Sequence, residues 1–435
     1  MEAISPLDGR YRKEVRPLLR FFSEKALNIA RLETEISYLT ALSGAGVIRP
    51  LTSHDAAAIN RILSSKRESH ARIKAIEQKI NHDTKSVEYF LRERMRGTSL
   101  EDLIPFVHIG LTSTDIDNLA WGVLFRKALE KEIMPALIAL QAKIRALAEE
   151  YKDCPMLGRT HGQPAVPMTL GEVFRNFFTR LNRESEKLYW RADEVPGKLS
   201  GAVGNFSALK AAYPEIDWEE FGALFVSSQG LQPMLDTTQT PPYEDLTEIF
   251  DDLRRINLIV IDLDRDIWSY LSYGDLILPK VGQEVGSSTM PQKVNPIQFE
   301  MSEANLKIAN ALLEMLSREL ILNRMQRDLT DKELMRVVGE AWAYSYLSWG
   351  FTLGGLERVR ANPERMRRNL EEHWEGLGEA VQTILRKHGY LDAYERIQKL
   401  MQGRTLDASA YRQLIAELKT QISAAAGEEI DRISL

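Results

Sequence analysis

The chain has 435 residues, of which 44% are hydrophobic and 27% are charged, which is ordinary for a globular protein. Its 56 basic and 62 acidic side chains give a net charge of −6 without a basic block or tail, so a nucleic-acid surface is not expected. A single cysteine, Cys154, excludes an internal disulfide, which fits a reducing compartment. The N-terminus is charged and the sequence has no long apolar run. These features together predict a cytoplasmic protein that does not contact a membrane.

The pattern along the chain predicts an all-α fold. Shorter helices are expected up to residue 111, broken near 44–50 and 97–105 by glycine and proline. No strand pattern is visible. Longer helices are expected at 117–152, with a kink at Pro135, and at 168–194, 243–273 and 297–325.

The long helices predict how the chain is divided. They exceed the mean helix length of about 11–12 residues and are rich in apolar side chains, so they favour an elongated bundle with further burial between subunits. We therefore expect an N-terminal helical domain at 1–111, a central long-helix bundle at 112–362 and a C-terminal helical domain at 363–435.

Residues 81–83, Asn-His-Asp, precede a helical run. Asn81 or Asp83 could simply cap that helix, with His82 exposed at its start. The same three polar side chains could instead line a ligand site, and the residues alone leave both interpretations open.

Residues 112–115, Thr-Ser-Thr-Asp, precede the next long helix. Ser113 or Thr114 is the expected cap. Because a helix start also presents free backbone N–H groups and positive partial charge, Thr112 and Ser113 could hold a carboxylate there as well.

Residues 158–164, Gly-Arg-Thr-His-Gly-Gln-Pro, are expected to lie between two helices. His161 stands between Thr160 and Gly162, a composition that suits close approach of a ligand. A lone loop histidine is often only solvated, so a functional and an inert role both stay open.

Residues 286–296 read Gly-Ser-Ser-Thr-Met-Pro-Gln-Lys-Val-Asn-Pro. Two serine hydroxyls, one cation and one amide between a glycine and a proline suit holding a carboxylate and moving a proton beside it. Further on, the mixed charges of 324–336 are typical of a solvated face, although Arg327 and Arg336 could bind a phosphate through their guanidinium groups.

Other kinds of site lack support in the sequence. There is no His-x-x-x-His or Cys-x-x-Cys spacing for a metal, no Walker or Rossmann glycine pattern and no Gly-x-Ser-x-Gly elbow. The remaining side chains, Ser, Thr, His, Lys, Arg and amides, suit proton transfer beside a carboxylate without a metal or a cofactor.

The run 286–296 contains every fixed position of Gly-Ser-Ser-x-Met-Pro-x-Lys-x-Asn-Pro and resembles the signature loop of the fumarase/aspartase superfamily. Residues 112–115 and 158–165 resemble the other active-site regions of the superfamily, in the same order. The resemblance implies a three-domain helical fold, a homotetramer with a 20-helix core, and active sites each shared by three subunits.

Within the superfamily the chain most resembles the adenylosuccinate lyases. That narrower resemblance rests on residues 4–11 (ISPLDGRY), 81–90 (NHDTKSVEYF), 200–205 (SGAVGN), 237–239 (TTQ) and 324–331 (RMQRDLTD). It implies a small nucleotide substrate. It also implies anti β-elimination of fumarate, from adenylosuccinate to give AMP and from SAICAR to give AICAR, in purine nucleotide biosynthesis.

The resemblance implies a role for each matching residue. Ser287 would be the general base and His161 the general acid, with Glu300 as the charge partner of the histidine. The other residues would bind substrate: Arg10, Tyr11, Arg327 and Arg336 at the phosphate, Asn81, His82 and Asp83 on the nucleotide side, Thr112, Ser113, Lys293 and Asn295 at the succinyl carboxylates, and Thr160 and Gln239 elsewhere. Because a serine hydroxyl is a weak base, the loop 282–296 is expected to close over the substrate.

Some positions depart from the family pattern. Met301 replaces a polar residue, Lys332 replaces a small hydroxyl residue near the phosphate, and Gln292 replaces a histidine. An argininosuccinate lyase-like enzyme would share the signature loop but should lack the segments at 10–11 and 81–83. A non-catalytic protein on this fold, such as a lens crystallin, should lack the Ser, His or Lys of the site, and all of these are present.

Overall fold

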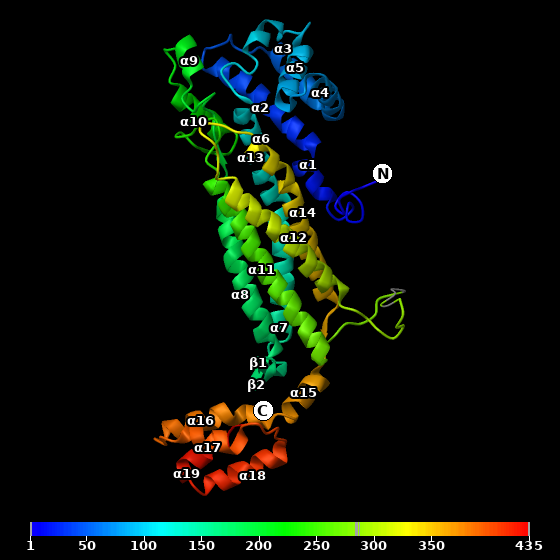
Figure 1. Ribbon diagram of the computed structural model, residues 1–435, viewed down its shortest axis with the longest axis vertical. Helices are drawn as coiled ribbons and strands as arrows, with labels where there is room; N and C mark the ends of the chain where they lie inside the picture. Colours follow the sequence, from blue (N-terminus) through cyan, green and yellow to red (C-terminus); the bar gives the residue numbers. More distant parts are fainter. Residues whose placement is uncertain (1, 283–285, 287, 434–435) are drawn as a thin grey trace. The chain divides into compact units, whose positions relative to one another are not determined.

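The computed structural model describes residues 2–282, 286 and 288–433, and the longer elements are labelled in Figure 1. The chain divides into two compact units. The first holds Met1–Ile138, Asn182–Val260 and Ser302–Gly350, and the second holds Ala139–Leu181, Ile261–Met301 and Phe351–Leu435. The predicted all-α class is confirmed, with only short strands added in the described part of the chain.

The first unit contains short helices and one small parallel strand pair, β3 with β4. As predicted, helices end near 44–50 and 97–105. In chain order the elements wholly in this unit are η1 (Arg16–Leu18), α1 (Leu19–Phe22), α2 (Glu24–Gly44), α3 (Ser53–Ser64), α4 (Lys66–Ile80), α5 (Asp83–Met95), η2 (Glu101–Phe106), α6 (Ser113–Ala128), the π-helical turn η3 (Leu129–Ile133), β3 (Pro196–Gly197), α9 (Ser207–Ala212), α10 (Trp218–Ser228), β4 (Gln232–Pro233), α13 (Thr330–Leu334) and η4 (Met335–Val337).

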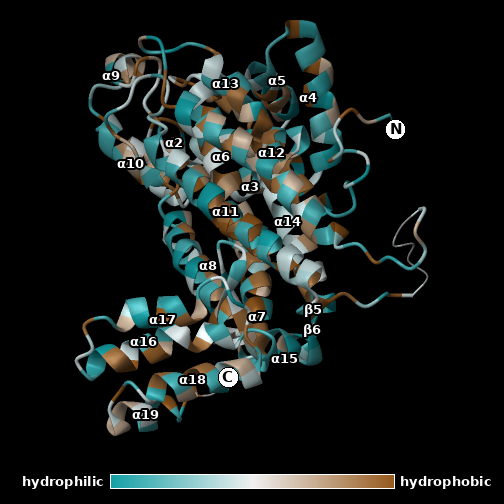
Figure 2. Ribbon diagram, turned by 60° about the horizontal axis from the view of Figure 1, so that its bottom comes forward, coloured by the Kyte–Doolittle hydropathy of each residue, from teal (hydrophilic) through white to brown (hydrophobic). Residues whose placement is uncertain are grey.

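Long helices have residues in both units, and hydrophobic and hydrophilic residues share each of them (Figure 2). They are α7 (Met134–Glu150), α8 (Leu170–Ala192), α11 (Glu244–Tyr273), α12 (Ile297–Glu319) and α14 (Val338–Arg358). The helices expected at 168–194 and 243–273 are thus confirmed. No helix in the described residues is long and apolar enough to cross a membrane.

Two details of the long helices differ from expectation. The helix expected at 297–325 ends at Glu319, because the Asn323 side chain accepts the backbone N–H groups of Arg324 and Asp328, both at 2.9 Å, and forms a turn there. Helices α6 and α7 are joined through η3, where the Met134 N–H donates to the Leu129 carbonyl five residues back. This wider turn stands directly before Pro135, which has no N–H to donate.

An aromatic cluster forms part of the core of the first unit. The Trp342 ring of α14 lies 5.2 Å from Phe22 and 5.4 Å from Phe125, measured between ring centroids. Phe250 of α11 meets Phe125 edge to face at 6.2 Å. Such rings bury large apolar areas, and Phe125 belongs to α6, the helix that follows residues 112–115.

A β-hairpin is the main correction to the sequence-based fold. Strands β1 (Pro155–Thr160) and β2 (Gln163–Thr169) of the second unit pair antiparallel where a loop between helices was expected. Prolines at 155, 164 and 167 disfavour a helix. His161 and Gly162 have φ angles of 52° and 73°, which is the positive-φ pair that a tight two-residue hairpin turn requires.

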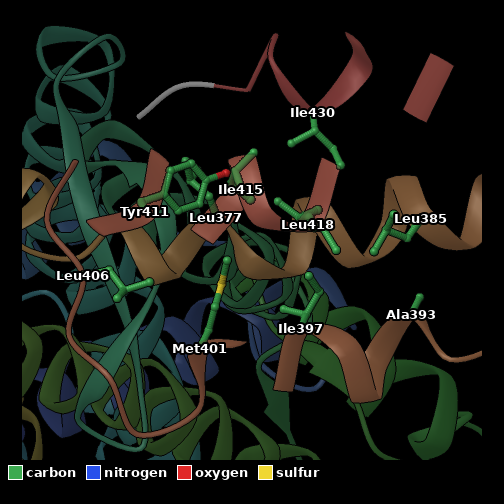
Figure 3. Packing of buried hydrophobic residues seen from close by; sticks show 11 residues of the cluster. Leu377, Leu385, Ala393, Ile397, Met401, Leu406, Tyr411, Ile415, Leu418 and Ile430 are labelled. Carbon is green, nitrogen blue, oxygen red and sulfur yellow. The ribbon is translucent and has the colours of Figure 1, made fainter. Parts of the chain in front are cut away.

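The second unit also contains an apolar cluster at the C-terminus (Figure 3). Its buried side chains come from η5, from the four helices that follow it and from Leu406 between α17 and α18, and Leu385, Ile397 and Met401 lie among them. The remaining elements of this unit are β5 (Leu276–Ile277), which pairs with β6 (Arg360–Ala361), and α15 (Pro363–Glu371), η5 (Trp374–Leu377), α16 (Gly378–Lys387), α17 (Ala393–Met401), α18 (Ala408–Lys419) and α19 (Ala424–Ile430).

We expect Leu385→Ala to destabilise this cluster by about 2–5 kcal/mol, because the side chain is fully buried and its loss leaves a cavity. Leu391→Ala is the matched control, since Leu391 is fully exposed and its replacement should change stability by less than about 0.5 kcal/mol. Urea unfolding followed by circular dichroism measures both. Equal midpoints for the two variants would contradict the cluster's role.

Candidate active site

A pocket in the first unit brings together residues that are far apart in the sequence. Arg31 of α2, Asp83 of α5 and Asp117 of α6 line it together with the segment 327–336 around α13. Three predicted site residues, Asp83, Arg327 and Arg336, therefore lie around one pocket. Asp83 and Arg327 belong to segments that carry the narrower resemblance.

Four charged side chains of this pocket form a closed ring, called the charge ring below. Arg31 donates from Nη2 to Asp83 Oδ2 at 3.0 Å and from Nε to Asp117 Oδ1 at 2.7 Å. Lys332 Nζ lies 2.6 Å from Asp83 Oδ1 and 3.1 Å from Asp117 Oδ2. The Thr84 hydroxyl adds a hydrogen bond to Asp117 Oδ1 at 3.0 Å. Each carboxylate thus lies between two cations.

The ring keeps Asp83 and Arg31 ionised. Burial acts to raise the pKa of Asp83, but the charges of Arg31 and Lys332 outweigh it and hold that pKa well below its usual range. Burial acts to lower the pKa of Arg31, and the charges of Asp117 and Asp83 outweigh that effect and raise it. Asp83 and Arg31 therefore both stay charged around neutral pH.

The predicted phosphate segment is anchored by one carboxylate. Asp331 forms an ion pair with Arg327 and accepts hydrogen bonds from the Tyr243 hydroxyl at 2.9 Å and the Lys332 backbone N–H at 2.7 Å. Burial raises the pKa of Tyr243 well above its usual value, so this phenol stays a donor. Arg336 is 56% exposed and pairs with Glu333 at 3.1 Å. The expectation of a merely solvated face is therefore wrong for Arg327, which is anchored in the pocket.

In the segment 81–83, the residue that caps α5 is His82 rather than the expected Asn81 or Asp83. Asn81 ends α4 with a φ of 51°, and His82 caps α5 by accepting the Lys85 N–H at Nδ1, 3.2 Å away. Both Asn81 and His82 are exposed. Asp83 does not cap, because its carboxylate is held by Arg31 and Lys332.

At 112–115 the cap is Thr112 rather than Ser113 or Thr114. Asp115 reaches back with Oδ2 to the Thr112 N–H at 2.9 Å, which leaves Ser113 as the first helical residue. Its other oxygen, Oδ1, accepts the Ser200 N–H at 3.0 Å and pairs with Lys198 Nζ at 2.9 Å. Because Asp115 and Lys198 are both fully buried, they fix the start of α6 against residues 198–201.

The segments 200–205 and 237–239 lie side by side, as their shared resemblance to substrate-side segments would require. The hydroxyls of Ser200 and Thr237 are 2.8 Å apart, and Gln239 donates to the Ala202 carbonyl at 2.9 Å. Gly204 has a φ of 87°, and a Cβ there would come within 1.9 Å of the Thr237 carbonyl oxygen. Only glycine permits this approach.

Other predicted residues belong to the second unit. His161 is exposed in the hairpin turn and Thr160 ends β1. Asn295 donates to the Gly286 carbonyl at 2.8 Å, Lys293 is exposed, and Glu300 accepts the Trp268 indole N–H at 3.1 Å. The predicted base, Ser287, lies outside the described residues.

The structure thus divides the predicted residues between its two units. The first unit holds Arg10, Tyr11, Asn81, His82, Asp83, Thr112, Ser113, Gln239, Arg327 and Arg336, and the second holds Thr160, His161, Lys293, Asn295 and Glu300. Arg10 and Tyr11 lie in the turns before η1, where the Arg10 guanidinium lies 5.7 Å from the centroid of the Tyr11 ring. Among the described residues, no group of His, Cys, Asp and Glu side chains is arranged to hold a metal ion.

Sequence reasoning missed Arg31, Asp117 and Lys198. Each is a charged residue that is more than nine-tenths buried. The sequence does not distinguish them from exposed charges: Arg31, for example, stands two residues before Glu33 in α2. Such a residue needs a buried partner, but the sequence does not identify that partner.

A histidine whose side chain is 15% exposed stands four residues before Thr112. His108 Nδ1 lies 2.5 Å from Glu35 Oε1, and the Glu35 side chain is fully buried. Burial acts to lower the pKa of His108, but the hydrogen bond and charge of Glu35, helped by Glu88 and opposed by Lys85, raise it overall. The folded chain therefore binds this proton more tightly than the unfolded chain does.

A raised histidine pKa stabilises the fold below the unfolded value of about 6.5, and this stabilisation is lost as pH rises through the folded pKa. We expect His108→Gln to lose about 1.5–3 kcal/mol at acidic pH and less at alkaline pH. Thermal unfolding across this pH range measures the difference. His54→Gln, at an exposed site, should follow the unaltered chain, and a pH-independent deficit for His108→Gln would contradict the ionic pair.

Comparisons with known proteins agree on one family. Residues 9–312 match the family model described as "Lyase", and residues 323–435 match the model described as "Adenylosuccinate lyase C-terminal". The chain is 40% identical over 420 residues to the adenylosuccinate lyase of Escherichia coli K12, covering 95% of this chain and 92% of that protein. It is 41% identical over 413 residues to the adenylosuccinate lyase of Dictyostelium discoideum, covering 92% and 88% of the two chains.

Solved structures show the same fold at low sequence identity. A fumarate lyase from Mesorhizobium sp. BNC1 has a TM-score of 0.75 at 20% identity and covers 97% of this chain and 93% of its own. A 3-carboxy-cis,cis-muconate lactonizing enzyme from Pseudomonas putida has a TM-score of 0.77 at 21% identity, covering 96% and 92% of the two chains.

Proposed function

The chain belongs to the adenylosuccinate lyase family and is a lyase with that family's activity, and from this premise we propose that it eliminates fumarate from adenylosuccinate and from SAICAR. The products are AMP and AICAR. Ser287 is the general base and His161 the general acid, and the chain's own residues carry the reaction without a cofactor.

One observation carries this proposal at the level of the residues. Asp83 from the segment 81–90 and Arg327 from the segment 324–331, two segments that carry the narrower resemblance, both line the pocket of the charge ring. Arg327 and Arg336 bring guanidinium groups there, and these suit the paired oxygens of a nucleotide phosphate. Arg10 and Tyr11 complete the phosphate contacts in the proposal, and Asn81 and His82 face the nucleotide.

Elimination creates negative charge on the succinyl group, which fixed donors must stabilise. Ser287 removes a proton from the carbon beside a carboxylate, giving a dianion. Thr112 and Ser113 stand at the N-terminus of α6, a 16-residue helix whose free N–H groups attract a carboxylate. Lys293 and Asn295 supply the remaining donors, and the Asn295 amide already donates to the Gly286 carbonyl at 2.8 Å.

The C–N bond breaks as His161 protonates the departing nitrogen. The tight turn at 160–163 leaves the imidazole exposed, which supports access by a substrate. Thr160 contacts substrate beside the histidine in the proposal, Gln239 contacts it from the 237–239 segment, and Glu300 is the charge partner of the imidazole. The hydrogen bond from Trp268 leaves the second oxygen of Glu300 for that role.

We further propose a homotetramer whose active sites are each shared by three subunits and whose long helices form a 20-helix core. Large exposed apolar side chains on the long helices support burial in an assembly, with Trp190 68%, Leu258 51% and Ile308 45% exposed. The three-domain division and the cytoplasmic location stay predictions.

An ultraviolet assay of the purified chain tests the reaction. We expect adenylosuccinate to be converted to AMP and fumarate, while argininosuccinate, malate and aspartate stay unchanged in parallel assays. Conversion of argininosuccinate alone would be compatible with the proposed elimination mechanism, but it would refute the residues assigned to nucleotide binding. If a folded tetramer showed no activity on any of these substrates, the result would favour the alternative of a non-catalytic structural protein.

Two substitutions test the roles of the acid and the base. Ser287→Ala and His161→Gln should each lower kcat by about 10²–10⁴-fold, because each removes a proton-transfer group, while substrate binding changes little. Ser288→Ala is the matched control for the serine pair. Near-normal turnover of Ser287→Ala, with a large loss in Ser288→Ala, would move the base to the second serine.

A further inference from the structure

The Lys332 ammonium is held within the protein by two ion pairs and by a hydrogen bond to a hydroxyl. Its Nζ lies 2.6 Å from Asp83 Oδ1, 3.1 Å from Asp117 Oδ2 and 3.3 Å from Thr84 Oγ1. Lys332 thus donates hydrogen bonds to Asp83 and Thr84 and forms a further ion pair with Asp117. The side chain is only 14% exposed. Lys332 is thus placed to act on Asp83 and Asp117 rather than to serve as a free surface cation.

Lys332 also sets the charge balance of the pocket. Without it, the anionic side chains around the pocket would outnumber the cationic ones, and only Arg31 would lie between the two ring carboxylates. The charged lining residues are Glu24, Arg31, Asp83, Asp117, Arg327, Asp331, Lys332 and Arg336. An excess negative charge at short range and in partial burial repels a phosphate dianion.

The charge ring is linked to the phosphate segment through the chain itself. The Lys332 backbone N–H donates to Asp331, and the same carboxylate pairs with Arg327. Arg336 follows Lys332 by four residues in η4. Holding the Lys332 ammonium against α5 and α6 therefore fixes the position of the segment that bears both arginines.

We propose that Lys332 is a positioning residue that determines the affinity for the phosphate of the nucleotide: it neutralises Asp83 and Asp117 and holds the Arg327–Arg336 segment in place. This inference rests on the proposed function. It identifies Lys332 as a further residue that sets the phosphate affinity of the proposed site. A small hydroxyl residue at position 332 would lack both effects. The role concerns binding of the phosphate-bearing part of the substrate and leaves the proton transfers untouched.

The test compares Lys332→Ser with the unaltered chain in turnover of adenylosuccinate and in AMP binding by calorimetry. We expect KM and the Kd of AMP to rise about tenfold, while kcat changes less than about twofold. The reason is that the phosphate is bound equally well in the ground state and in the transition state, so weaker phosphate binding raises KM without slowing the chemical step. Inhibition by fumarate, which has no phosphate, should not change. Lys332→Arg, which keeps the charge, should recover most of the affinity.

A double variant separates charge balance from direct phosphate contact. Lys332→Ser combined with Asp117→Asn removes one charge of each sign, so it should bind AMP more tightly than Lys332→Ser alone. Lys66→Ser is the matched control, since it removes a lysine from an exposed ion pair with Glu33. Lys66→Ser should leave kcat, KM and the Kd of AMP unchanged.

Several outcomes would overturn the inference. These are an unchanged Kd for AMP in Lys332→Ser, a fall in kcat at constant KM, or a double variant no better than the single one. If Lys332→Ser does not fold, Lys332→Gln keeps most of the stem, lacks the charge and carries the same comparison. Failure of the unaltered chain to convert adenylosuccinate would refute the proposed function instead, and AMP binding would still test Lys332.

Discussion

Buried charges that must be paired are the constraint on which the candidate site depends. An unpaired charge in the interior costs several kcal/mol, so Asp115 is bound to Lys198, and Asp83 and Asp117 are bound to Arg31 and Lys332. Each pairing joins chain segments that are distant in sequence. The ion pairs therefore determine which loops face one another, and the apolar core around Trp342 supports the helices that carry them.

Irregular backbone marks the segments that carry the family resemblance. Among the described residues other than glycine, positive φ angles occur at Asn81, His108, His161, Phe206 and Met325. Each stands in or within four residues of a segment that resembles a part of the family's active site. Such conformations cost free energy and persist where the surroundings impose them. Here they produce sharp turns of the backbone where a helix or strand meets a segment that carries polar side chains.

The sequence predicted the all-α class and most long helices, because apolar spacing in α8 and α11 is regular over many turns. It missed the hairpin around His161, since two short strands with prolines carry little alternation. It named Asp83 and Arg327 from motifs but not Arg31 or Lys198, because a buried ion pair depends on a partner distant in sequence. Caps at 81–83 and 112–115 were misplaced by one or two residues, because several neighbouring side chains can cap equally well.

The charge ring has a consequence for how this site can change during evolution. Because Arg31, Asp83, Asp117 and Lys332 balance one another, a substitution that removes one charge leaves another uncompensated inside the protein. Exchange of Lys332 for a neutral residue is therefore tolerated best after an acid beside it has been lost, or together with that loss. The order of mutations is constrained, and positions 83, 117 and 332 should vary in concert among descendants of this chain.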